Sequence, residues 1–115
     1  MNSTITIDVA LDENRVPESI QWSATESNAD RPQKAKALML SFWDNADKAA
    51  LRIDLWTKDM MVDEMADFFY QTLMTMADTY GRATKYTDQV DELKAFANEF
   101  YKKFQSKQLA QNKAD

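Results

Sequence analysis

The sequence predicts a small α+β protein in which helices predominate, on three observations. Only one glycine and two prolines occur among 115 residues, which disfavours a many-stranded sandwich with frequent tight turns. Three short segments alternate apolar and polar residues with the period of two that is typical of strands. Other segments repeat apolar residues every three or four positions, as amphipathic helices do. We therefore expect a single domain over residues 1–115, with a core over about residues 4–105 and a polar tail over 106–115.

The first two elements are predicted to form an antiparallel hairpin. Alternation predicts a strand over residues 5–11, a polar turn over 12–15 and a returning strand over 19–24. Pro17 cannot donate a ladder hydrogen bond, so we expect an edge or an irregular bend near it. The apolar face of this hairpin is expected to hold Ile5, Ile7, Val9, Leu11, Ile20, Trp22 and Ala24.

The next segment is predicted to be a surface connection followed by a helix. Residues 25–33 contain Pro32 and no apolar side chain larger than alanine. An apolar stripe of about two helical turns then predicts a helix that ends in the polar residues 44–47. The stripe consists of Ala35, Leu38, Met39, Phe42 and Trp43.

A third strand is predicted over residues 51–56. Leu51, Ile53 and Leu55 share one face, which we expect to be turned toward the core. The opposite face then carries Arg52, Asp54 and Trp56.

Two further helices complete the predicted fold. A long helix begins near Met61, and Gly81 is a local weak point or the end of it. Thr87 is a candidate cap for the last helix, whose apolar stripe ends at Phe104. The predicted order is thus β-β-α-β-α-α, an antiparallel sheet of about three strands with amphipathic helices packed on one face. The stripe of the long helix comprises Met61, Val62, Met65, Phe68, Phe69, Leu73, Met76 and Tyr80.

Composition argues against several classes of function. A formal charge of −5, from 19 acidic and 14 basic residues, would repel a phosphate backbone, so we expect no nucleic-acid partner. Without histidine or cysteine, the usual general base, thiol nucleophile and transition-metal ligands are missing, and one glycine cannot build a phosphate loop. We expect no enzyme, no cofactor and no metal.

The chain is also expected to lie in the cytoplasm. Its first residues lack the basic start and apolar stretch of a secretory signal. No window approaches the roughly 20 apolar residues of a membrane span, because acidic and basic residues interrupt the most hydrophobic region.

The densest group of carboxylates leaves one alternative open. Asp59, Asp63, Glu64 and Asp67 could hold a divalent cation, but their spacing lacks the alternating ligands and glycine of an EF-hand. An acidic first turn that stabilises its own helix accounts for the same residues and is favoured.

Protein binding is therefore the function that the residues favour. An outward Trp56, beside Arg52 and Asp54, is a candidate anchor for a partner, although a helix end or tail could cover it instead. Tyr70 and Met74 lie on the back of the long helix. They are predicted either to contact the final helix, which is favoured, or to join the same interaction surface.

Three segments of the chain carry a resemblance to a known family: LRIDLWTKDMMVDEMADFFYQTLMTMADTYGRAT at 51–84, LDENRVPESIQW at 11–22 and KAKALMLSFWD at 34–44. In these segments the chain resembles the gliding-motility protein GldC family of Bacteroidetes. The family has proline where this chain has Met61, which implies a slightly different helix start.

The resemblance implies an accessory protein of gliding motility, in organisms whose gliding machinery is linked to a dedicated secretion system. It implies no reaction and no ligand residues. Our leading hypothesis is a non-enzymatic cytoplasmic protein, or one held at the inner membrane through partners, that binds a component of that machinery. The alternatives are a self-associating structural module, a homo-oligomer, and a carboxylate-based metal-binding protein.

Overall fold

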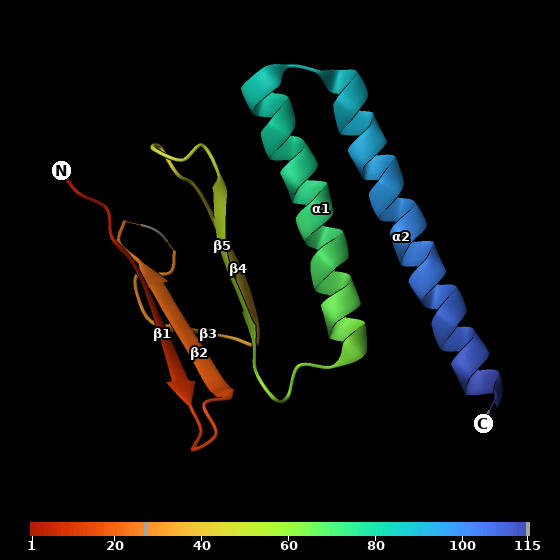
Figure 1. Cartoon of the computed structure of the whole chain (residues 1–115), viewed down its shortest axis with the longest axis horizontal. Helices are drawn as coiled ribbons and strands as arrows, with labels where there is room; N and C mark the ends of the chain where they lie inside the picture. The colour runs from red at the N-terminus through yellow and green to blue at the C-terminus, as the bar shows by residue number, and fades with distance from the viewer. Residues whose placement is uncertain (27, 115) are drawn as a thin grey trace. The chain divides into compact units, whose positions relative to one another are not determined.

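A computed structural model, which describes residues 1–26 and 28–114, confirms the α+β class (Figure 1). Antiparallel strands come first in the chain and two long helices follow. The chain divides into two compact units, Met1–Met60 and Met61–Asp115. The strands are β1 (Ile5–Leu11), β2 (Pro17–Ala24), β3 (Gln33–Ala35), β4 (Ala37–Trp43) and β5 (Ala50–Trp56), and the helices are α1 (Val62–Thr84) and α2 (Thr87–Ala114). The predictions of one domain and of helices packed on one sheet face stay predictions.

The predicted β1–β2 hairpin is confirmed. Ile7 lies opposite Trp22 and Val9 opposite Ile20, so the apolar residues of both strands share one face, as their alternation requires. Ile20 is 1% exposed and is the largest fully buried apolar side chain of the described residues. The ladder shifts register between Ala10 and Leu11, which is the irregularity expected near Pro17.

The predicted helix over residues 34–43 is wrong. These residues form β3 and β4, two strands separated by Lys36. β3 extends the first sheet in the order β1-β2-β3, and β4 pairs with β5 in a second, two-stranded sheet. The predicted order β-β-α-β-α-α is corrected accordingly. Apolar residues occupy both faces of β4, and this double pattern imitates the stripe of a helix.

β5 confirms the third predicted strand, but its apolar face is not a closed core. Leu51 lies opposite Phe42, Ile53 opposite Leu40, and Leu55 opposite Leu38. Leu51 is 55% exposed and Ile53 is 52% exposed, so the expectation that this face is buried is not met.

The second unit is a helical hairpin. Met61 is the N-cap of α1, and its backbone N–H donates to Glu64 Oε1 at 3.0 Å. Gly81 lies inside α1 rather than at its end, because the chain leaves the helix at Lys85 in the left-handed conformation (φ 66°). A Cβ at Gly81 would stand 2.9 Å from Val90 Cγ2, so the glycine permits close approach of α2.

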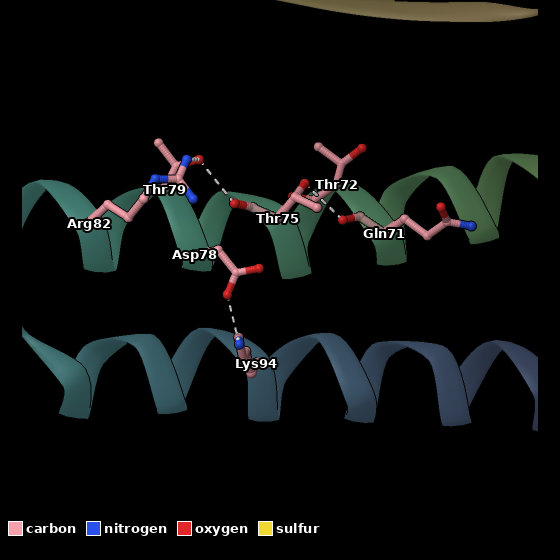
Figure 2. A network of polar contacts seen from close by, with 7 residues as sticks. All are labelled: Gln71, Thr72, Thr75, Asp78, Thr79, Arg82 and Lys94. Atoms are coloured by element: carbon pink, nitrogen blue, oxygen red, sulfur yellow. Dashed lines mark hydrogen bonds and ion pairs between the residues drawn. The ribbon is translucent and has the colours of Figure 1, made fainter.

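Small buried residues define the contact between the two helices. Ala77 and Ala97 are 0% exposed and Ala66 is 8% exposed. Asp78 and Lys94 form an ion pair across the hairpin at 2.8 Å (Figure 2). The pKa of Lys94 is raised, chiefly by its hydrogen bond to Asp78. α2 begins at Thr87, so this residue lies in the first turn of the helix and is not the cap that precedes it. The helix continues to Ala114 and includes much of the predicted polar tail.

Candidate interaction surface

The face of β5 opposite to its leucines carries the predicted interaction residues. Arg52, Asp54 and Trp56 alternate along the strand and therefore share this face. The Arg52 guanidinium donates twice to the Asp54 carboxylate, from Nη2 at 2.9 Å and from Nε at 3.3 Å. Trp56 is 57% exposed, so its indole has the accessibility that an anchor for a partner needs.

β4 adds residues to this face that the sequence interpretation missed. Met39 lies opposite Asp54, Ser41 opposite Arg52, and Trp43 opposite Ala50. Trp43 is 70% exposed, which makes it a second accessible tryptophan on the same surface. The signal that could have revealed it is the period of two shared by Met39, Ser41 and Trp43. We name the face formed by Met39, Ser41, Trp43, Arg52, Asp54 and Trp56 the tryptophan face.

The end of β5, next to Trp56, is anchored by hydrogen bonds. Thr57 is 2% exposed, and its backbone N–H donates to the carbonyl of Lys36 at 2.8 Å. Its hydroxyl lies 3.2 Å from the same carbonyl and contacts the Asp59 carboxylate. The pKa of Asp59 is lowered, chiefly because that hydroxyl favours the charged carboxylate.

An ion pair holds the following residue to the β1–β2 turn. Lys58 Nζ lies 2.5 Å from Asp12 Oδ2, and the backbone N–H of Lys58 donates to the Pro17 carbonyl at 3.3 Å. The pKa of Asp12 is lowered by its bond to Lys58 and by the backbone N–H of Val16, and the pKa of Lys58 is raised by Asp12. Asp12 and Pro17, which lie far from β5 in the sequence, thus hold the chain in place directly after β5 ends.

Tyr70 and Met74 belong to the other unit. The Tyr70 ring lies 5.1 Å from that of Tyr101, and its hydroxyl lies 3.2 Å from Asn98 Oδ1, so Tyr70 contacts α2. Met74 is half-buried on α1. Nearby polar side chains of α1 are bonded within that helix, as for Thr75 Oγ1 and the Gln71 carbonyl at 3.0 Å (Figure 2).

Three of the four carboxylates considered for a metal site, those of Asp59, Glu64 and Asp67, have other partners. Glu64 accepts the Met61 backbone N–H at the start of α1, and Asp59 accepts the Thr57 hydroxyl. A hydrogen bond to Asp67 is the main reason that the pKa of Tyr101 is raised. Within residues 1–26 and 28–114, no three or more acidic side chains come together in a way that could hold a metal ion.

The structure is that of a small α+β protein with an accessible face that carries two exposed tryptophans and the Arg52–Asp54 ion pair. A family model described as "Gliding motility-associated protein GldC-like" matches residues 17–106, well over half of the chain. The chain belongs to this GldC-like family, which confirms the resemblance of its three segments. No curated protein and no solved structure matches it. In the described part of the chain, neither helix combines the length and the apolar character that a membrane span needs.

Proposed function

We propose that this chain is a non-enzymatic accessory protein of bacterial gliding motility that binds a protein component of the motility or secretion machinery. Membership of the GldC-like family implies a role in gliding motility. The observation that carries the binding role is the exposed Trp56, held beside the Arg52–Asp54 ion pair at the anchored end of β5. Tyr70 contacts α2, as the favoured alternative predicted, and a contact of Tyr70 and Met74 with a second protein stays a prediction.

The chemistry of the tryptophan face suits a protein partner. Tryptophan and arginine are the residues most enriched among those that dominate binding energy, and two exposed tryptophans flank the ion pair here. The absence of histidine and cysteine from the sequence, together with carboxylates engaged by neighbouring groups, supports binding over catalysis. We place this binding in the cytoplasm, with the partner holding the protein near the inner membrane.

Trp56→Ala tests the proposal. Because truncation of an interface anchor costs about 2 kcal/mol or more, the dissociation constant of the complex should rise roughly 30-fold. The tagged chain would be used for affinity capture from a gliding organism, followed by titration with the captured component. A strain whose only copy carries Trp56→Ala should spread less over a surface.

A matched control is Tyr86→Ala, which truncates another exposed aromatic side chain, 59% exposed, in the helical unit. It should leave capture and spreading unchanged. Unfolding curves of both variants check the fold. Unaltered capture by a folded Trp56→Ala variant would show that the tryptophan face is not the contact surface.

A further inference from the structure

The outer edge of β5 is an open strand edge. β5 pairs with β4 in a two-stranded sheet, and no other strand of residues 1–26 and 28–114 pairs with its second edge. Such an edge presents a row of backbone donors and acceptors that another extended strand can use. Because proteins commonly cover such edges or pair them with another strand, we expect the outer edge of β5 to bind a further strand.

Hydrogen bonds at both ends of the β4–β5 hairpin show which residues of β5 face outward. Asp44 N–H donates to the Ala49 carbonyl and Thr57 N–H donates to the Lys36 carbonyl, each at 2.8 Å. Since backbone groups alternate between the two edges of a strand, Leu51, Ile53 and Leu55 direct theirs to β4. The outer edge is therefore formed by the backbone groups of Ala50, Arg52, Asp54 and Trp56.

The order of residues along β5 is complementary to itself. When two copies of the strand are placed antiparallel about a twofold axis at Ile53, Arg52 of each copy lies opposite Asp54 of the other. The backbone N–H and C=O groups of both charged residues point to the outer edge. In this register the backbone of Arg52 can therefore hydrogen-bond to that of Asp54 in the other copy. A shift of the register by two residues would set Arg52 opposite Arg52 of the other copy in one direction, and Asp54 opposite Asp54 in the other direction. Like charges directly opposite each other are destabilising.

The sizes of the side chains agree with the same register. It sets Trp56 opposite Ala50 of the second copy, and within each copy Ala50 lies opposite Trp43. Each small alanine would thus lie between two tryptophans, which leaves room for both indoles. On the other face, Leu51 would lie opposite Leu55 and Ile53 opposite Ile53. These residues would form a continuous apolar row, in which Leu51 and Ile53 are about half exposed in one chain.

We propose that two copies of this chain pair antiparallel through the outer edges of their β5 strands, forming a four-stranded sheet in the order β4-β5-β5-β4. We assign the edge to a second copy because the antiparallel register centred on Ile53 sets Arg52 of each copy opposite Asp54 of the other. This homodimer goes beyond the proposed motility role and does not depend on it.

Charge reversal provides the first test, with the full chain studied by sedimentation velocity over a concentration series. The unaltered chain should show a concentration-dependent dimer. Arg52→Asp or Asp54→Arg alone opposes like charges at both symmetry-related positions and should raise the dimer dissociation constant at least about tenfold. The double variant R52D/D54R restores opposite charges and should return the constant to within about threefold of the original.

The double variant is also the control for folding, since it contains both substitutions. A strict monomer at every concentration, or a double variant as weakened as the single ones, would overturn the proposal. Neither outcome affects the motility role, which is judged by capture with Trp56→Ala. Loss of capture alongside a monomeric chain would reject the dimer and retain the partner surface.

A disulfide gives a second, independent test because the sequence has no cysteine. Ile53→Cys would lie opposite itself in a non-hydrogen-bonded pair, where Cα atoms are roughly 4.5 Å apart and a disulfide can form. Mild oxidation should yield a covalent dimer. Leu51→Cys on the same face is the matched control, since its two copies would be roughly 13 Å apart along the strands. Equal cross-linking of both variants would contradict the register.

Discussion

Thr57→Val should weaken the fold in a way that depends on pH. The substitution keeps the shape of a side chain that is 2% exposed and keeps the backbone N–H bond to Lys36, but it removes the hydroxyl. That hydroxyl has one proton to donate, and its acceptors are the Lys36 carbonyl and the Asp59 carboxylate. A hydrogen bond contributes about 0.5–1.5 kcal/mol net to stability. Because the Thr57 side chain is buried, we expect a loss of about 1 kcal/mol in the free energy of unfolding at pH 7.

The pH dependence follows from the lowered pKa of Asp59. A carboxylate whose pKa is lower in the folded state contributes stability above its ordinary value of 3.8, and this contribution is lost as pH falls through the folded pKa. Because the Thr57 hydroxyl is the main cause of the lowering, the difference between the original chain and Thr57→Val should be full at pH 7. It should shrink below about pH 4.

Urea unfolding at pH 7 and pH 3 measures both effects. Thr57→Ser is the matched control, because it keeps the hydroxyl and should keep the pH-dependent part of the stability. A loss for Thr57→Val that is equal at the two pH values would refute the reasoning, since it would place the cost in packing rather than in the bond to Asp59.

Two further predictions concern the two units separately. Ala97→Leu should destabilise the helical hairpin by about 1–3 kcal/mol, because Ala97 is 0% exposed and has no room for a larger side chain; Phe96→Ala, at a residue 59% exposed, should cost far less in the same urea titration. Asp12→Asn should lower the urea midpoint at pH 7, because it removes the charge that pairs with Lys58. Since the pKa of Asp12 is lowered in the fold, this gap should close as pH falls below its ordinary value of 3.8; a gap that persists in acid would contradict the role of the ion pair.

Local patterns were sufficient for most of the elements. β1 and β2 each bury one face, so strict alternation and a polar turn identified them together with their shared face. The helices α1 and α2 carry long stripes, and their period is unambiguous over several turns. The polar tail was predicted from its lack of packing residues, and Leu109 is 60% exposed there. α2 nevertheless continues into this tail, because its last residues include good helix formers such as lysine, glutamine and alanine.

The segment that became β3 and β4 could not be identified from its own residues. β4 is apolar on both faces, and a short apolar run of this kind fits either a strand or a helix. The decision rests on pairing with β5, in which Leu38, Leu40 and Phe42 find apolar partners across the hairpin. β3, with three residues, is too short to show any period. The same error concealed Trp43, whereas Trp56 was assigned to the correct face because β5 itself was identified.

β5 contributes both to the tryptophan face and to an open strand edge, and Arg52 and Asp54 belong to both surfaces. An exposed ion pair within one strand contributes little to stability, so the bond between Arg52 and Asp54 does not explain the fold. At an open edge, however, two opposite charges around Ile53 discriminate one antiparallel register from its neighbours. Pairing in that register would place two copies of the tryptophan face on one sheet. A partner with repeated sites could then engage both copies at once, and the second contact would form at a high effective concentration.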